Sequence, residues 1–267
     1  MKVNPVDCAS IPIDPNAILV TFQNDQPKPF VASLSKWSWT SPERTVNGVG
    51  NVPMLPFLEE MQEGEIYIDV GANIGQTSMP ALVRGIETYA FDPIEYDIRR
   101  ICEGHQTNLQ RGHATTGRNF HLYRTLVGNE LKAEAEIYRP EEGFGKFEQS
   151  SLYANRIGVV RKPKLVTEIV PMVTLDYIIP EDKPIGLVKI DVQGAELIVV
   201  HGMTKILSRS KGYPPVIFYE EQARGNQRAG VPTGMVQKFL ENNYGYTCQR
   251  LDRSDIVCRK PRAGQTN

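Results

Sequence analysis

The sequence has no excess of charge of either sign and no long hydrophobic run. Thirty Lys and Arg residues balance 31 Asp and Glu residues, so the 267-residue chain carries a formal net charge of −1. A protein that coats DNA needs a basic surplus to neutralise phosphates, and the balance leaves room only for a local basic patch. No stretch approaches the roughly 20 apolar residues of a membrane helix. The first 15 residues lack a secretory core or a transit-peptide character. We therefore expect a cytoplasmic protein that makes no membrane contact.

Cysteine is scarce and widely spaced. The four cysteines, at positions 8, 102, 248 and 258, form no CxxC pair and no tight, even series. Such spacing predicts neither a disulfide framework nor a zinc site. The four histidines form no HExxH motif. We expect free thiols in a reducing compartment and no metal site built from a local motif.

The chain divides into three parts. Residues 1–50 are rich in proline, and the apolar runs Ala17–Phe22 and Phe30–Leu34 flank a turn signal, which predicts a hairpin with an extended arm. Residues 51–260 form the main domain, and residues 261–267 form a polar, flexible tail. Small hairpins commonly cover a sheet edge or pair with another chain. We expect the N-terminal extension to be a cap or a dimer arm.

In the main domain, apolar strands alternate with helical patterns. The predicted strands are Ile66–Val70, Thr88–Phe91, Phe120–Val127, Leu187–Ile190 and Val216–Tyr219. The predicted helices are Pro53–Gln62, Gln76–Arg84, Glu95–Leu109, Ala195–Leu207 and Thr233–Asn243. We expect Ala135–Tyr138 to form a hairpin with the third strand, and Tyr246–Leu251 to pair with Asp255–Arg259. This alternation predicts an α/β fold with a mostly parallel sheet covered on both faces.

The first strand ends in an acid and a glycine-containing turn. In open parallel sheets, ligands bind beyond the carboxyl ends of the strands. Here Asp69 is followed by the sequence VGANIG, which is neither GxGxxG nor GxxxxGK[ST]. Because a carboxylate repels phosphate, the loop favours a ligand with an ammonium or sulfonium group. The alternative is that Asp69 only caps the turn.

Two further strands also end in acids. Asp92 ends the second strand, 21 residues after Gly71, and an acid at this distance typically binds a ribose diol. The alternative is that it caps the following helix. Asp191 ends the fourth strand, where a reacting group could face the cofactor, and Lys189 and Glu196 lie nearby. A structural ion pair between Lys189 and Glu196 is the simpler interpretation of those two charges.

Three segments together resemble the FkbM-type family of S-adenosylmethionine-dependent methyltransferases. They are IYIDVGANIGQTS at 66–78, TYAFDP at 88–93, and VTLDYI with GLVKIDVQGAELIVVHG within 173–202. The resemblance covers about residues 53–260. It implies a class I (Rossmann-like) methyltransferase domain with a seven-stranded, mostly parallel sheet whose last strand is antiparallel. The chain departs from the family at Gln193, because the family usually has DVEGAE there.

The resemblance also implies roles for individual residues. The methionine part of S-adenosylmethionine would be surrounded by the first loop, at Asp69, Gly71, Ala72, Asn73 and Gly75. Asp92 would bind the ribose hydroxyls, Thr125 and Leu126 would lie by the adenine, and Asp191 would lie close to the sulfonium methyl.

A hydroxyl acceptor needs alignment with the methyl group and a base or polarising group. Asp191 and Glu220, at the ends of the fourth and fifth strands, are the candidate bases, with Asp191 first because its strand end should face the methyl. Lys189 and His201 lie behind them as further candidates. For His201 the simpler interpretation is a ring satisfied at a helix end.

Two polar loops, 139–164 and 222–234, should build the acceptor pocket. Their candidate contacts are Ser150, Ser151, Arg224, Asn226 and Arg228. We predict O-methylation of a sugar or another small hydroxylated metabolite. A contiguous basic face on these loops would instead favour a nucleic acid, and a protein acceptor is also open. A nicotinamide oxidoreductase is disfavoured by Asp69 and the missing GxGxxG. Only Gln193 favours a non-catalytic binding module.

Overall fold

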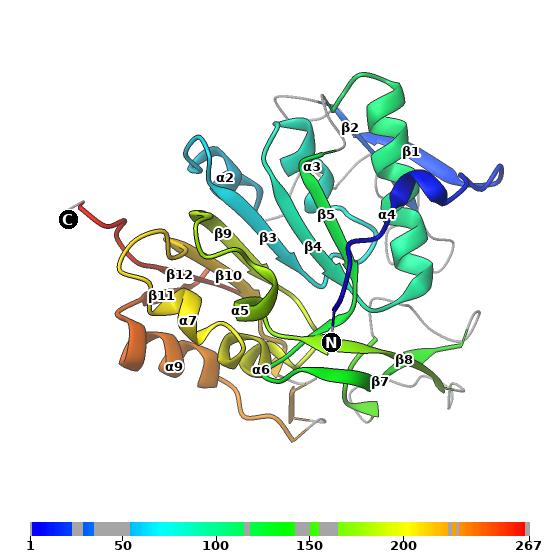
Figure 1. Ribbon diagram of the computed structural model, residues 1–267. Coiled ribbons are helices and arrows are strands. Elements are labelled where there is room, and N and C mark those ends of the chain that lie inside the picture. The colour runs from blue at the N-terminus through cyan, green and yellow to red at the C-terminus, as the bar shows by residue number, and fades with distance from the viewer. Residues whose placement is uncertain are drawn as a thin grey trace.

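The structure is a computed structural model that describes residues 2–22, 29–34, 54–114, 118–141, 150–154, 165–223, 226–227 and 230–264. Its centre is a seven-stranded sheet in the order β11-β12-β10-β9-β3-β4-β5 (Figure 1). Five strands run parallel: β3 (Ile66–Val70), β4 (Thr88–Asp92), β5 (Phe120–Arg124), β9 (Ile185–Ile190) and β10 (Val216–Glu220). β12 (Asp255–Arg259) pairs antiparallel with both β10 and β11 (Thr247–Arg250). The predicted mostly parallel sheet with a closing antiparallel hairpin is confirmed.

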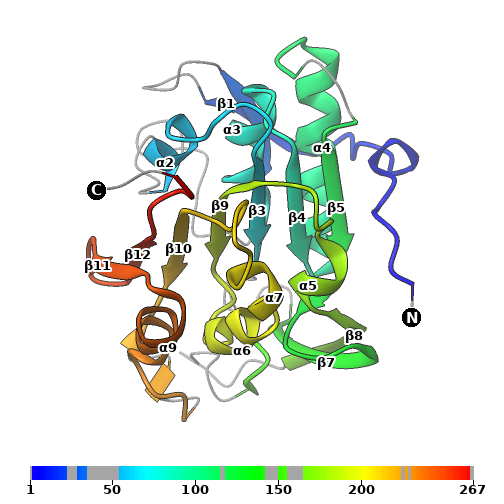
Figure 2. The same cartoon turned by 60° about the vertical axis from the view of Figure 1, so that its left-hand side comes forward.

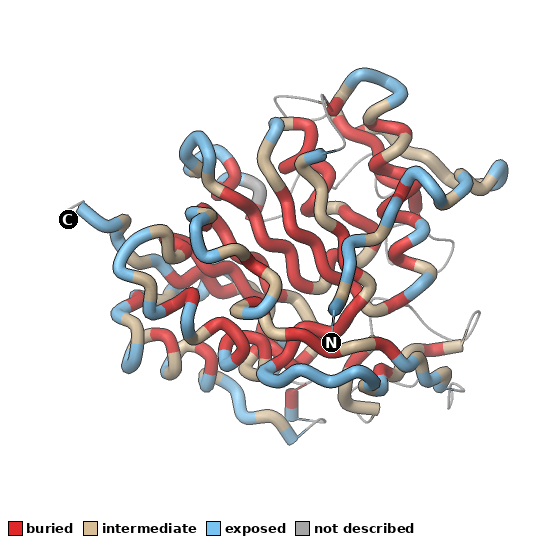
Figure 3. Tube along the Cα trace, in the orientation of Figure 1, coloured by how far each residue is buried: buried red, intermediate tan, exposed pale blue. Residues whose placement is uncertain are grey.

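Helices cover both faces of this sheet. One face carries α5 (Leu175–Ile178), α6 (Glu196–His201), α7 (Thr204–Leu207) and α9 (Met235–Tyr244). The other carries α2 (Leu55–Glu59), α3 (Ser78–Val83) and α4 (Glu95–Gln110). Figure 2 shows the first group in front of the strands and α3 and α4 behind them. The central strands are therefore buried on both sides (Figure 3).

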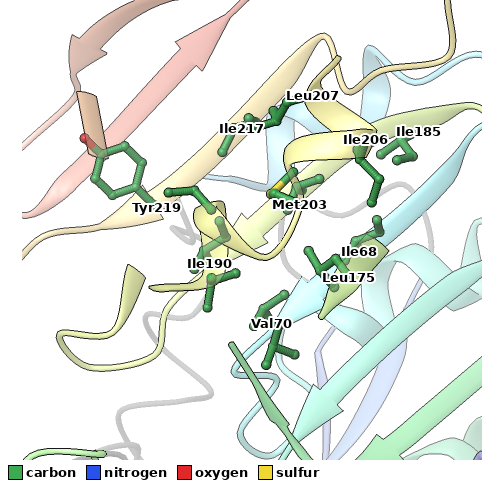
Figure 4. Packing of buried hydrophobic residues seen from close by; sticks show 14 of the residues in the cluster. Ile68, Val70, Leu175, Ile185, Ile190, Met203, Ile206, Leu207, Ile217 and Tyr219 are labelled. Carbon is green, nitrogen blue, oxygen red and sulfur yellow. The ribbon is translucent and has the colours of Figure 1, made fainter. Parts of the chain in front are cut away.

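Alternation along β3 assigns its side chains to the two faces. Ile68 and Val70 point into the cluster formed with Leu175, Met203 and other apolar side chains (Figure 4). Each fully buried side chain of this size contributes about 1.5–3 kcal/mol. Asp69 lies between these two residues and points to the opposite face. The alternation along β3 thus places Asp69, the one acid of this strand, on the face of the sheet that α3 covers.

The N-terminal extension forms a cap on the helices behind the sheet. The predicted hairpin is confirmed as β1 (Ile18–Phe22) paired with β2 (Phe30–Leu34), and β2 is buried along its whole length. Asn108 of α4 bonds both the backbone N–H and the carbonyl of Val31, as a neighbouring strand would. Glu103 of α4 accepts the Ser33 hydroxyl at 2.6 Å. The hairpin covers α3 and α4, and the arm before it donates the Val6 N–H to the carbonyl of Leu122 in the edge strand β5. The dimer arm remains a prediction.

A second, three-stranded sheet corrects the prediction for the third strand. The run 120–127 divides at Thr125 into β5 and β6 (Leu126–Val127), and the buried Thr125 hydroxyl donates to the carbonyl of Pro171. β7 (Lys132–Pro140) is antiparallel to β8 (Leu165–Val173), which also pairs with β6. The predicted hairpin of 135–138 with the third strand was therefore wrong. This sheet lies beyond the carboxyl ends of β4 and β5 (Figure 2).

The predicted helix 195–207 is two helices. α6 ends at His201 and α7 begins at Thr204. A Cβ at Gly202 would collide with the carbonyl oxygen of Gly128, so this position needs glycine where the chain after β6 passes. Gly202 is the C-cap of α6, and a glycine directly after the last helical residue is a common helix end that the sequence already displays.

The prediction of free thiols was wrong. Cys8, in the short turn η1 (Cys8–Ser10), is bonded to Cys102 of α4. Cys248 and Cys258 lie opposite each other in β11 and β12 and form a second disulfide. The first pair is 94 residues apart in sequence, so spacing carried no information about it. The argument for a reducing compartment falls with the free thiols, since disulfides are typical of oxidising environments.

Among the helices of the described part of the chain, none is long and apolar enough to cross a membrane.

Candidate cofactor and active site

A cavity of about 270 Å³ opens at the carboxyl ends of the parallel strands. Its wall is formed by the loops after β3, β4, β9 and β10 and by the second sheet. Of the predicted site residues it includes Gly71, Ala72, Asn73, Asp92, Thr125, Leu126, Ser150, Lys189, Asp191 and Glu220. The predicted position of the site is therefore where the structure has a cavity.

Asp69 lies beneath this cavity and not on its wall. Its side chain is 0% exposed, and one oxygen accepts the hydroxyls of Thr77 and Ser78 at 2.6 and 2.5 Å. Its other oxygen is 3.2 Å from the ammonium of Lys189, its register partner in β9. The predicted direct contact between Asp69 and a cofactor is corrected, because this carboxylate is committed to the loop and to Lys189.

Lys189 binds the loop as well as the acid. Its ammonium donates to the carbonyl of Gly71 at 2.5 Å. Burial alone would lower the pKa of Lys189, but the carboxylates of Asp69 and Asp191 outweigh it and raise that pKa. The lysine is therefore held as a cation. The alternative ion pair between Lys189 and Glu196 is not formed: the Glu196 carboxylate accepts the backbone N–H of Val192 and Gly194.

The loop after β3 is joined to the end of β4 through Asp92. Asn73, at a left-handed φ of 52°, donates its backbone N–H to one oxygen of Asp92, and Ile94 donates to the other. Asn tolerates this conformation better than most side chains. Burial raises the pKa of Asp92 to about 7, although both N–H donors act against it. Gly75, also at positive φ, packs against Met79 and is not part of the wall.

The far end of the cavity is apolar. Its wall there consists of the side chains of Phe91, Leu126, Val127, Ile137 and Leu152. Thr125 also lines it, but the Thr125 hydroxyl is occupied by the carbonyl of Pro171. An apolar wall beside a buried carboxylate suits a nucleoside, whose base is flat and whose ribose hydroxyls donate hydrogen bonds.

Three side chains meet at the other end of the cavity. The side-chain amide of Gln193 donates to Asp191 Oδ1 at 2.8 Å and to Glu220 Oε2 at 3.0 Å. Burial, and the nearby negative charge of Asp191, raise the pKa of Glu220 to about 7. Asp255, the register partner of Glu220 in β12, also lines the wall, and burial raises its pKa to about 6. This end therefore presents carboxyl groups able to exchange protons near neutral pH.

The remaining predicted residues are more distant from the wall. Ser151 is buried and donates its hydroxyl to the backbone carbonyl of Gln193. Asn226 is buried in the loop after β10 but does not line the cavity. His201 is exposed at the end of α6 and packs edge-on against Phe239. Arg224 and Arg228 lie outside the described residues.

At the acidic end of the wall, sequence reasoning missed two polar residues. Gln193 entered only as a departure from the family pattern, without a contact of its own. Asp255 was assigned to a terminal hairpin, although an acid at the first position of a strand beside β10 could have been suspected. No three His, Cys, Asp or Glu side chains of the described residues are placed to hold a metal ion.

Comparison with known proteins decides the family. Residues 69–248, more than half of the chain, match the family model described as a methyltransferase FkbM domain. This chain belongs to the FkbM methyltransferase family. The resemblance stated from the three strand-end segments is confirmed, and S-adenosylmethionine, which that resemblance implied, is the cofactor.

Solved methyltransferases are similar at low sequence identity. The FkbM methyltransferase from Methylobacillus flagellatus KT is 12% identical with a TM-score of 0.46, over 73% of this chain and 43% of that one. The tRNA (uracil-54, C5)-methyltransferase of Pyrococcus abyssi, in complex with S-adenosyl-L-homocysteine, is 13% identical with a TM-score of 0.40, over 90% of this chain and 43% of that one. The precorrin-6y C5,15-methyltransferase of Geobacter metallireducens GS-15 is 14% identical with a TM-score of 0.41, over 86% of this chain and 95% of that one.

This chain spans less than half the length of the first two of those structures. None of the curated proteins compared with it matches.

The residues of the cavity fit S-adenosylmethionine. Asp92 keeps lone pairs toward the cavity beyond the two that its backbone donors use, so a ribose diol can donate to it. The apolar end suits adenine. The backbone of Gly71, Ala72 and Asn73 borders the space between Asp92 and Asp191. The sulfonium end would then face the carboxylates, as a cation should.

Proposed function

We propose that this FkbM methyltransferase methylates a hydroxyl group of a sugar or another small metabolite. The observation that carries the proposal is the carboxyl pair of Asp191 and Glu220 on the cavity wall. A hydroxyl is a weak nucleophile at neutral pH, and a positioned base contributes roughly 10²–10⁴-fold. The raised pKa of Glu220, about 7, is suited to that task.

We propose distinct roles for the residues around the reaction. Asp92 and the loop 71–73 hold the nucleoside and methionine parts of S-adenosylmethionine, which supplies the methyl group. Asp191 stabilises the positive end of the cofactor. Glu220 takes the proton of the acceptor hydroxyl as its oxygen approaches the methyl carbon. Alignment of that oxygen contributes the larger share of the rate.

The chemistry of this wall supports a neutral or cationic acceptor. Asp191, Glu220 and Asp255 all border the acceptor end, and the ammonium of Lys189 there is paired with Asp69. A phosphate beside the reacting hydroxyl would meet like charge. Ser150, also on the wall, can bind an acceptor hydroxyl. Arg224, Asn226 and Arg228 remain proposed acceptor contacts, and a cytoplasmic location remains a prediction.

The direct test offers competing acceptors to one enzyme. The protein is incubated with S-adenosylmethionine labelled with ¹³C at the methyl group and, separately, with neutral sugars, amino sugars, total RNA and unfolded protein. The ¹³C shift of the transferred methyl distinguishes oxygen, nitrogen and carbon acceptors. We expect a methoxy signal on a small molecule, reduced at least 100-fold in Glu220→Gln. Transfer to RNA or protein alone would contradict the proposal.

A further inference from the structure

The loop after β9 contains an unusual backbone conformation. Gln193 has φ 55°, and in the described residues only Asn73 shares a positive φ without being glycine. A side chain in this region is strained and persists where the surroundings hold it. Here the carbonyl of Gln193 accepts the Ser151 hydroxyl at 2.8 Å. The next N–H, of Gly194, donates to Glu196 at 2.9 Å. The backbone is thus fixed on both sides.

The fixed backbone directs the Gln193 amide between two acids. Its nitrogen lies 2.8 Å from Asp191 Oδ1 and 3.0 Å from Glu220 Oε2. Carboxylates accept hydrogen bonds and do not donate them, so the NH₂ group is the end that must face them. Each of its two hydrogens has a carboxylate partner. A neutral donor therefore joins two groups of like charge.

A glutamate at this position would act in the opposite way. It would place a third carboxylate about 3 Å from the other two, where like charges raise one another's pKa. Other charged and polar groups around Glu220 are Asp191, Asp255 and the amide of Gln222, which donates to Glu220 Oε2 at 2.9 Å. Asp191 and Glu220 also lie within hydrogen-bond reach of each other. The amide of Gln193 is the neutral donor that bonds to both carboxyl groups.

We propose that Gln193 is a positioning residue that holds Asp191 and Glu220 side by side, so that Glu220 can take the acceptor proton. The inference rests on the proposed function. In the step it serves, the acceptor O–H bond breaks and its proton goes to Glu220. The oxygen forms a bond to the methyl carbon, the carbon–sulfur bond breaks, and its electron pair stays on sulfur. The proton then leaves Glu220 for solvent.

The experiment follows Glu220 directly and needs no acceptor. Carboxyl ¹³C resonances of glutamate-labelled protein are titrated from pH 4 to 10, and Glu220 is assigned by its absence in Glu220→Gln. Gln193→Glu and Gln193→Met are compared with wild type. We expect the Glu220 titration to move up by at least one pH unit in Gln193→Glu, which adds a charge. A smaller upward shift is expected in Gln193→Met, which removes a donor.

A matched control carries the same chemical change elsewhere. Gln237 donates to Glu241 at 3.1 Å on α9, so Gln237→Glu places an acid beside an acid outside the cavity wall. The titration of Glu220 should not move in that variant. An unchanged Glu220 titration in both Gln193 variants, or an equal shift in Gln237→Glu, would overturn the inference.

Wild-type protein provides a second readout if the variants fail to fold. The side-chain ¹⁵N–¹H₂ signals of Gln193 should change with the same midpoint as the carboxyl of Glu220. Independent midpoints would overturn the inference. Calorimetry with S-adenosylmethionine separates the two proposals. Cofactor binding with unlinked titrations rejects only the role of Gln193, whereas linked titrations without cofactor binding reject the proposed function.

Discussion

The loops after β3 and β9 are built alike but give their acids different partners. Each follows a buried parallel strand, each contains a non-glycine residue at positive φ, and the two loops touch: a Cβ at Gly71 would collide with the carbonyl of Asp191. In the first loop, Asp69 is neutralised by Lys189. In the second, Asp191 is joined to Glu220 by the neutral amide of Gln193.

This comparison teaches that the partner decides what a strand-end acid can do. Asp69, which is buried with a cation and two hydroxyl donors, serves the architecture of the loop. Asp191, which shares the amide of Gln193 with Glu220, lies on the cavity wall, and the pKa of Glu220 beside it is raised to about 7. The motif letters of the two loops are similar, and their chemistry differs because of residues on neighbouring strands.

The largest expected effect comes from breaking the first pair. Asp69→Asn removes the carboxylate that forms the ion pair with the buried Lys189 ammonium, so we expect a loss of about 3–5 kcal/mol in the free energy of unfolding. Urea unfolding followed by circular dichroism measures it. The double variant Asp69→Asn/Lys189→Met should recover part of the loss because it also removes the buried positive charge. A loss below about 1 kcal/mol in the single variant would refute the structural role of the pair.

The second prediction concerns the pH dependence of stability that arises from the pair of Asp191 and Glu220. The folded-state pKa of Glu220 is raised from 4.5 to about 7. The folded protein therefore binds the proton more tightly, and this group's contribution to stability is complete below pH 4.5 and lost as pH rises through 7. Glu220→Gln should lose this slope and be more stable than wild type at pH 8, by on the order of 2 kcal/mol.

Urea midpoints measured between pH 5 and 8 test this prediction. The control Glu63→Gln changes an exposed glutamate, and its slope should match that of wild type. If Glu220→Gln retains the wild-type slope, Glu220 is not the titrating group.

The smallest effect sharpens the contrast between the two positive-φ residues. Asn73→Gly keeps the backbone conformation and loses one bond from the Asn73 side chain to the N–H of Ile74, so stability should change by less than about 1 kcal/mol. Gln193→Gly equally relieves the backbone strain, but it should also shift the Glu220 titration. Asn73→Gly should leave that titration unchanged. Carboxyl ¹³C NMR titrations of Glu220 in both variants test this difference. Equal titrations would mean that only the backbone of Gln193 matters.

Much of this could be predicted from the sequence because apolar runs and strand-end acids are local signals. These local signals predicted the parallel strands, the closing hairpin, the family and the position of the cavity. Three features could not be predicted, for one physical reason: they depend on contacts between distant segments. The Lys189 partner of Asp69 requires the register of β3 and β9, the disulfide of Cys8 requires the docking of the N-terminal arm, and β8 has its partners 126–127 and 132–140.

The central claim is that the cavity between these loops binds S-adenosylmethionine through Asp92. Calorimetric titration of wild type and Asp92→Asn with S-adenosylmethionine and S-adenosylhomocysteine, at pH 6 and 8 with NADH as control, tests it most directly. A diol donates best to the carboxylate, and the pKa of Asp92 is about 7, so wild-type affinity should rise from pH 6 to 8. Asp92→Asn should bind roughly 10–100-fold more weakly at pH 8, without that rise. Equal affinity in the two proteins, or preference for NADH, would contradict the account.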